Sequence, residues 1–216
     1  MLDDQDSLEK FPQPSPSIRV QKDMIAVATL ERDAELMLRV RDGDTESFTF
    51  LLNKHRGPVI HFLYRMVQNQ AVAEELAQEV FLRVYKSRAN YEPSAKFTTW
   101  LFRIASHLAL NHIRDSKNER FQHSIDESDD DGMTLQVADR GMTTEQAMVY
   151  QARLAEIRRA IRVLPEKQRA AVIMHKYQEM EYSQIASVLE CSESAVKSLL
   201  FRAYETLRLR LAHMAG

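Results

Sequence analysis

The sequence contains little cysteine, glycine or proline, and each shortage excludes a class of structure. A single cysteine, Cys191, excludes an internal disulfide and is typical of a reducing compartment. Only 5 glycines and 6 prolines are present among 216 residues, so long stretches contain no helix-breaking residue. Alternating β-branched runs, which would indicate strands, are lacking. We therefore predict an all-α chain.

Long hydrophobic runs and known catalytic patterns are also lacking. The chain begins with the acidic residues Asp3, Asp4 and Asp6, and no long apolar run follows, so we expect a cytoplasmic protein without a signal peptide or membrane span. There is no HExxH motif, no paired Cys/His spacing, no Gly-rich phosphate loop and no Gly-x-Ser-x-Gly elbow. His107 and His112 are five residues apart and fall on different helix faces. We expect no enzyme, no metal site and no cofactor.

Charge is distributed unevenly along the chain. Residues 119–145 carry eight acidic and two basic residues, which predicts a flexible acidic linker whose simplest role is that of a solvated spacer. Residues 146–216 carry eleven basic and seven acidic residues, which favours a nucleic-acid partner for this part. Residues 1–32 contain three closely spaced prolines, so we predict a disordered N-terminal extension, with a partner-binding segment as the alternative.

Apolar periodicity divides residues 33–118 into four helices of one domain. Gly43 should end the first helix, and Pro58 is expected to kink or divide the second. The third exposes acidic residues opposite its apolar face. The fourth should run from about Thr98 to Lys117. Its residues Phe97, Trp100 and Phe102 are expected in the core rather than as stacking platforms.

The chain from Tyr182 onward has the pattern of a helix-turn-helix in a second domain, residues 146–216. Ile185, Ala186 and Leu189 share one helix face, and Ser192 or Ser194 can cap the next helix. That helix presents an exposed stripe suited to a major groove, although an ordinary solvated helix is the alternative. The stripe consists of Lys197, Ser198, Phe201 and Arg202.

A second candidate DNA-reading surface lies on the fourth helix. His107 and Asn111 are one turn apart and can hydrogen-bond an unstacked base, while Arg103 and Arg114 flank them and can hold phosphates. The preceding loop, residues 91–96, could close over a flipped base, and Lys96 within it could contact DNA.

Several blocks of the chain together resemble the extracytoplasmic-function sigma factors, which are small subunits of bacterial RNA polymerase. The resemblance covers roughly residues 33–117 and 145–212, and the N-terminal extension departs from the family pattern. The matching blocks are residues 77–85, 97–105, 164–169, 182–186 and 195–203.

The resemblance implies a promoter-specificity subunit. By this likeness, Glu75, Gln78 and Glu79 dock on the clamp coiled coil of the beta-prime subunit, and the second domain binds the beta flap. His107 and Asn111 lie beside the base captured from the minus-ten element, and the helix-turn-helix reads the minus-thirty-five element. The linker would thread the path of nascent RNA. Members of the family are often held inactive by an anti-sigma factor in stress or envelope responses.

A free-standing helix-turn-helix regulator is the competing interpretation. It needs no polymerase, but it leaves both the acidic face of the third helix and the helix containing Trp100 without a role.

Overall fold

The structure, a computed structural model, describes residues 32–122 and 143–214. Within these two ranges every regular element is a helix, which confirms the all-α prediction. Nearly all of the predicted extension, residues 1–32, lies outside the described residues. So does most of the predicted linker, residues 119–145.

The first domain consists of residues 32–41 and three longer helices: α2 (Thr45–Val67), α3 (Gln70–Lys86) and α4 (Phe97–Gln122). Gly43 adopts φ +103°, which favours glycine and ends the first helix as predicted. Asp44 then caps α2, because its carboxylate accepts the backbone N–H groups of Glu46 and Ser47 at 2.9 and 3.1 Å. A short 3-10 turn, Arg88–Asn90, follows α3.

Two helices differ from the sequence prediction. The sequence predicts that Pro58 kinks or divides the second helix. Pro58 lies inside α2 and the helix continues through it to Val67, so of these two alternatives the division is wrong. Proline removes one backbone donor, but Val59, Phe62 and Leu63 are fully buried just beyond it, and that burial outweighs the lost hydrogen bond. α4 also continues to Gln122, five residues past the predicted end.

The second domain contains α5 (Thr144–Arg162), α6 (Glu166–Tyr177), α7 (Tyr182–Leu189) and α8 (Glu193–Leu211), followed by a short 3-10 turn, Ala212–Met214. Thr143 and Gln146 form a reciprocal capping box at the start of α5. Pro165 is the N-cap of α6, immediately before the first turn of that helix. α6, α7 and α8 pack on one another, and α5 packs along α8.

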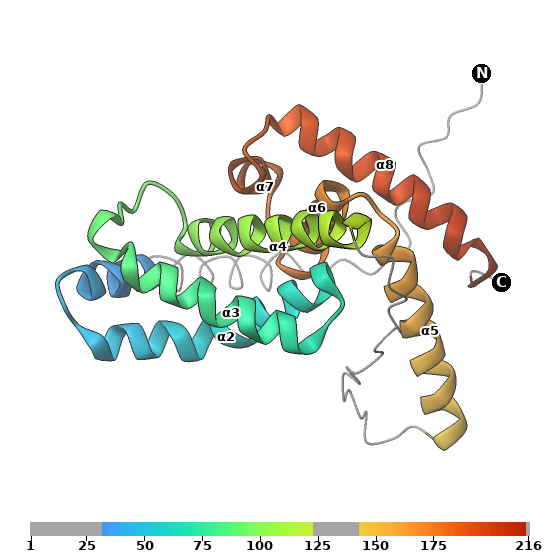
Figure 1. The fold of residues 1–216 in the computed structure, drawn as a ribbon, viewed down its shortest axis with the longest axis horizontal. Helices are drawn as coiled ribbons and strands as arrows, with labels where there is room; N and C mark the ends of the chain where they lie inside the picture. Colours follow the sequence, from blue (N-terminus) through green and yellow to red (C-terminus); the bar gives the residue numbers. More distant parts are fainter. Residues whose placement is uncertain (1–31, 123–142, 215–216) are drawn as a thin grey trace, which may run out of the picture.

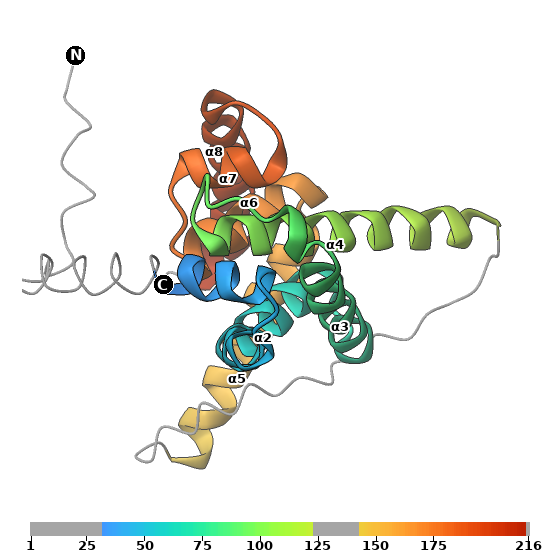
Figure 2. The same cartoon turned by 90° about the vertical axis from the view of Figure 1, so that its left-hand side faces the viewer.

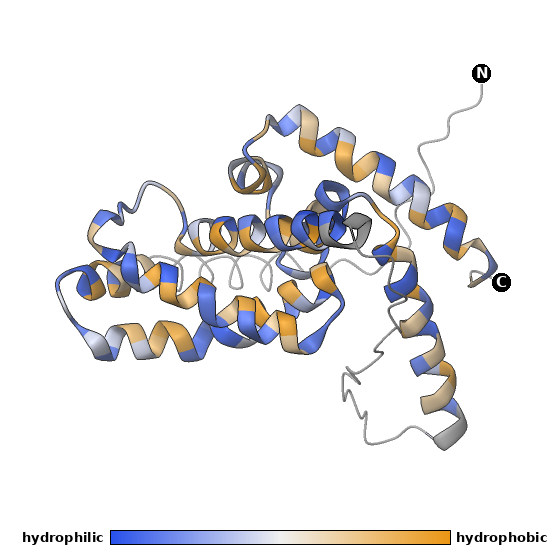
Figure 3. Ribbon diagram, viewed as in Figure 1, coloured by the Kyte–Doolittle hydropathy of each residue, from blue (hydrophilic) through white to orange (hydrophobic). Residues whose placement is uncertain are grey.

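α4 lies between the two domains (Figures 1 and 2). It packs on α2 and α3 within the first domain and on α6 and α7 of the second. Hydrophobic and hydrophilic positions alternate along the helices (Figure 3), as expected for amphipathic helices around shared interiors. The buried apolar residues of the two domains form one continuous cluster.

Candidate nucleic-acid interface

The helix-turn-helix is formed by α7, a tight turn and α8. Ser192 is the residue that caps α8, since its hydroxyl accepts the backbone N–H of Ala195 at 3.2 Å. Glu190 ends α7 in the left-handed conformation, with φ 52°, at a position where such turns often use glycine. Ala186 and Val196 are buried where the two helices pack. These contacts fix the direction in which α8 leaves the turn.

The predicted stripe on α8 is exposed along its whole length. Phe201 is 69% exposed, an unusual position for a large apolar ring, while Leu200 and Ala203 beside it are buried. Lys197 and Arg202 make no ion pair with any described residue. Ser198 donates its hydroxyl to the Ser194 carbonyl at 3.0 Å, so it offers mainly its oxygen to a ligand. Two cations therefore flank an exposed aromatic ring.

The predicted stripe on α4 is also exposed. Arg103, His107, Asn111 and Arg114 follow one another at spacings of four, four and three residues, so they share one face over roughly 17 Å. Arg114 is 3.4 Å from the carboxylate of Asp115. A hydrogen-bonding edge at the centre and a cation at each end match a nucleotide with its flanking phosphates.

The loop before α4 differs from the expectation in one respect. Tyr91 is only 2% exposed, and its ring contacts Trp100 with centroids 5.0 Å apart, so it is part of the core and is not available to cover a base. Lys96 is exposed, as predicted. Phe97 and Phe102 are buried and Trp100 is half-buried, which confirms these aromatics as core residues.

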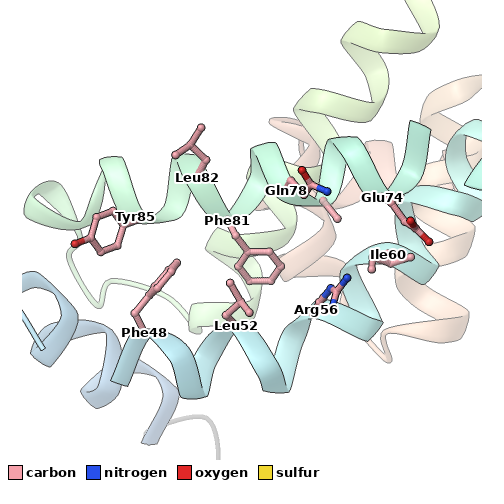
Figure 4. A pocket seen from close by; sticks show the side chains of 10 residues that line it. Phe48, Leu52, Arg56, Ile60, Glu74, Gln78, Phe81, Leu82 and Tyr85 are labelled. Carbon is pink, nitrogen blue, oxygen red and sulfur yellow. The ribbon is translucent and has the colours of Figure 1, made fainter. Parts of the chain in front are cut away.

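α3 carries an acidic surface next to an apolar groove. Glu75 and Gln78 are exposed, and Glu79 is half-exposed and accepts the Arg83 Nε at 2.7 Å. The adjacent groove runs between α2 and α3 (Figure 4), and Leu82 on its rim is 45% exposed. The groove is lined by Phe48, Leu52, Arg56, Ile60, Glu74, Ala77, Gln78, Phe81, Leu82 and Tyr85.

Sequence reasoning did not identify some residues of this surface. Glu193 and Ser194 are exposed in the first turn of α8, where recognition helices usually contact bases. One signal in the sequence could have identified these two residues: the cap residue Ser192 marks where the first turn of α8 begins. Glu190 lies 3.6 Å from the imidazole of His107 across the domain boundary, and no sequence pattern indicates that contact.

Two features are absent from residues 32–122 and 143–214. None of their helices is long and apolar enough to cross a membrane. Nor do these residues bring together three or more His, Cys, Asp or Glu side chains that could hold a metal ion.

Comparison with known proteins identifies the two domains. The family described as "Sigma-70 region 2" matches residues 51–119, and that described as "Sigma-70, region 4" matches residues 154–207. The RNA polymerase sigma-H factor of Pseudomonas aeruginosa is 29% identical over 180 residues, which cover 83% of this chain and 93% of that protein. The ECF RNA polymerase sigma factor SigW of Bacillus subtilis is 29% identical over 175 residues, which cover 80% of this chain and 93% of that protein.

A solved structure shows the same fold. The sigma factor RpoE of Bartonella quintana, in complex with the anti-sigma factor NepR, superposes with a TM-score of 0.63 at 19% identity, covering 77% of this chain and 98% of that one. The two family matches occupy the two domains separately, in chain order and on either side of residues 123–142. The chain belongs to the sigma-70 family and is a sigma factor of the extracytoplasmic-function group, a specificity subunit of RNA polymerase rather than an enzyme.

Proposed function

We propose that this sigma factor divides promoter recognition between two helices, with α8 reading the minus-thirty-five element and α4 capturing the minus-ten element. The observation that carries the proposal is the pair of exposed stripes. The stripe on α8 contains the cations Lys197 and Arg202, and the stripe on α4 has the cations Arg103 and Arg114 at its ends. Sigma factors bind core polymerase and promoter DNA, so each stripe needs a defined DNA target.

The minus-thirty-five element is read as duplex. α8 enters the major groove, where Lys197 and Arg202 reach guanine acceptors or phosphates, and the Phe201 ring covers a thymine methyl group. Ser198 accepts a hydrogen bond from a base amino group. The exposed first turn, Glu193 and Ser194, lies closest to the base edges.

The minus-ten element is captured as opened DNA. His107 and Asn111 hydrogen-bond the edge of an unstacked base, and Arg103 and Arg114 hold the phosphates on either side. Extracting a base costs a few kcal/mol, and the phosphate contacts offset part of that cost. Lys96 adds a cation at the start of α4. Tyr91 supports this surface from the core, through Trp100.

Docking on polymerase uses the acidic side of α3. Glu75, Gln78 and Glu79 face the clamp coiled coil of the beta-prime subunit, where carboxylates against basic residues steer association. Leu82 and the groove between α2 and α3 extend this surface with apolar area. The second domain contacts the beta flap, which positions α8 upstream of α4.

We further propose that an anti-sigma factor controls this chain, as NepR binds the Bartonella relative named above. The protein acts in the cytoplasm, where core polymerase is found.

Transcription with purified core polymerase and genomic DNA fragments tests the proposal. Holoenzyme formed with this chain should start RNA at sites that share two sequence elements, at constant spacing upstream of each start. Core polymerase alone should show no such sites. Start sites that share only one element, or none, would contradict the assignment of two reading helices.

A further inference from the structure

The groove between α2 and α3 presents apolar side chains on a concave surface. It encloses about 410 Å³, and Phe48 and Leu52 of α2 face Phe81 of α3 across it (Figure 4). The rings of Phe48 and Tyr85 close one end, with centroids 5.0 Å apart. Leu82 on the rim is 45% exposed. Exposed apolar side chains gathered around a hollow favour an occupant that covers them.

The rim of the groove on α3 is acidic. Glu74 and Glu75 are exposed, and neither forms an ion pair with another residue of the ranges 32–122 and 143–214. Arg56 is the cation among the lining residues. An occupant with an apolar face and an excess of basic residues therefore complements the groove and its acidic rim.

A segment of this character occurs in the same chain, in residues 18–30. Val20, Met24 and Val27 follow one another at spacings of four and three residues, which would place them on one face of a helix. The segment carries two basic residues and one acidic residue, so its net charge is opposite to that of the rim. An apolar helix face laid into a hydrophobic groove is a common mode of peptide recognition.

The segment is tethered close to the groove. The described part of the first domain begins at Arg32, whose guanidinium lies 5.5 Å from the centroid of the Phe50 ring on α2. Gln21 is eleven residues before Arg32, a length that reaches roughly 36 Å when extended. α2 rises only roughly 18 Å between Phe48 and Ile60, so the segment can reach every part of the groove.

We propose that residues 18–30 occupy the groove between α2 and α3 as an amphipathic helix, and that core polymerase displaces them when it docks there. This proposal rests on the proposed function, which assigns the groove to polymerase docking. A segment on a short tether has an effective concentration on the order of 1 mM, so a contact with a Kd of roughly 0.1 mM would keep the groove about 90% occupied. The apparent affinity for polymerase then falls about tenfold, because only the unoccupied fraction is free to dock.

Disulfide cross-linking in the full free chain tests the occupancy. Cys191 is replaced by serine, and Gln21→Cys is paired with Gln78→Cys, which places the second thiol on the exposed edge of the groove. Gln5→Cys with Gln78→Cys is the matched reference, since it changes the same residue type outside the segment. Under a mild oxidant, the Gln21 pair should close an intramolecular disulfide at least twentyfold faster than the Gln5 pair. The difference in tether length alone accounts for about fourfold.

Two variants of the extension separate apolar contact from charge. Val20→Asp with Met24→Asp removes the apolar face and should return the cross-linking advantage of the Gln21 pair to about fourfold. Leu2→Asp with Leu8→Asp adds the same two carboxylates outside the segment and should leave that advantage unchanged. In chains without the added cysteines, the Val20/Met24 variant should bind core polymerase about tenfold more tightly than wild type. The Leu2/Leu8 variant should bind with wild-type affinity.

Two cross-linking results would overturn the proposal. One is an advantage of about fourfold or less for the Gln21 pair in the otherwise unchanged chain. The other is a disulfide that forms mainly between two chains and accelerates with protein concentration, which would assign the groove to a second copy. Neither readout involves polymerase or DNA, so failure of the proposed function would show separately. Rapid cross-linking with no gain in polymerase affinity for the Val20/Met24 variant would refute the competition and remove the groove from the docking surface.

Discussion

The carboxylate of Asp33 and the imidazole of His55 lie 2.9 Å apart in the core of the first domain. Lys54 donates to the same carboxylate at 2.6 and 2.7 Å, so one acidic side chain with 1% exposure holds two partners on α2. The His55 ring in turn packs on Phe97 at the start of α4, with centroids 5.3 Å apart. This cluster ties the first helix to α4, the helix on which we propose the minus-ten surface.

The Asp33 cluster predicts an acid-sensitive first domain. Burial alone would raise the pKa of Asp33, but hydrogen bonds from His55 and Lys54 outweigh it, so this pKa lies below its ordinary value. A lowered folded-state pKa contributes stability above the unfolded value of about 3.9, and that stability is lost as pH falls through the folded pKa. We expect Asp33→Asn to lower the free energy of unfolding at pH 7 by about 1–2 kcal/mol.

Urea unfolding at pH 7, 4 and 3 measures both effects. The wild-type chain should lose stability more steeply than Asp33→Asn between pH 4 and pH 3. Asp42→Asn, whose carboxylate is 72% exposed, is the matched control and should change little at any pH. Equal pH slopes for wild type and Asp33→Asn would show that this carboxylate is not the source of acid sensitivity.

Phe201 should contribute to DNA reading and not to stability. We expect Phe201→Ala to weaken promoter binding by holoenzyme about fivefold, because an apolar contact to a thymine methyl is lost. Unfolding free energy should change by less than about 0.5 kcal/mol, as for other exposed side chains. Leu209→Ala, on the same helix and 74% exposed, is the control. Equal loss in both variants would argue against a specific role for Phe201.

His107 and Asn111 should act after polymerase binding. Replacing both with alanine should leave assembly with core polymerase intact and reduce open-complex formation at least tenfold, because the captured base loses its hydrogen bonds. Permanganate reactivity of unpaired thymines measures the open complex. Asn118→Ala, exposed farther along α4, serves as the control. Normal strand opening in the double variant would place base capture elsewhere.

Glu79 should be required for assembly. Reversal to lysine removes one carboxylate from the α3 surface and repels Arg83 within the same helix, so affinity for core polymerase should fall at least tenfold. Glu35→Lys, an equal reversal on the exposed side of residues 32–41, should bind normally. Competition binding with labelled core polymerase compares the two. Wild-type affinity in Glu79→Lys would remove this residue from the docking surface.

Local features of the fold were predictable because short-range chemistry decides them. Gly43 ends a helix through its left-handed backbone, Ser192 caps α8 with its hydroxyl, and the stripe containing Phe201 follows from helical spacing. Local sequence left open whether Pro58 kinks or divides the second helix, because burial of the residues after it, such as Val59 and Phe62, decides between the two.

Contacts between the domains were also beyond sequence reasoning. The guanidinium of Arg169 donates to the carbonyl of Met66, more than a hundred residues away in the chain, and no local pattern around Arg169 indicates that contact. Tyr91 falls in a polar loop but is buried against Trp100. Such contacts depend on how whole helices pack against one another, and the spacing of apolar and polar residues within one helix does not determine that packing.

The most direct test of the account compares promoter binding by the chain alone and with core polymerase. We expect the purified chain to bind a promoter duplex weakly, and we expect added core polymerase to produce a tight complex that starts RNA at a fixed position. Tight, sequence-specific binding by the chain alone, with no RNA started in the presence of core polymerase, would contradict it.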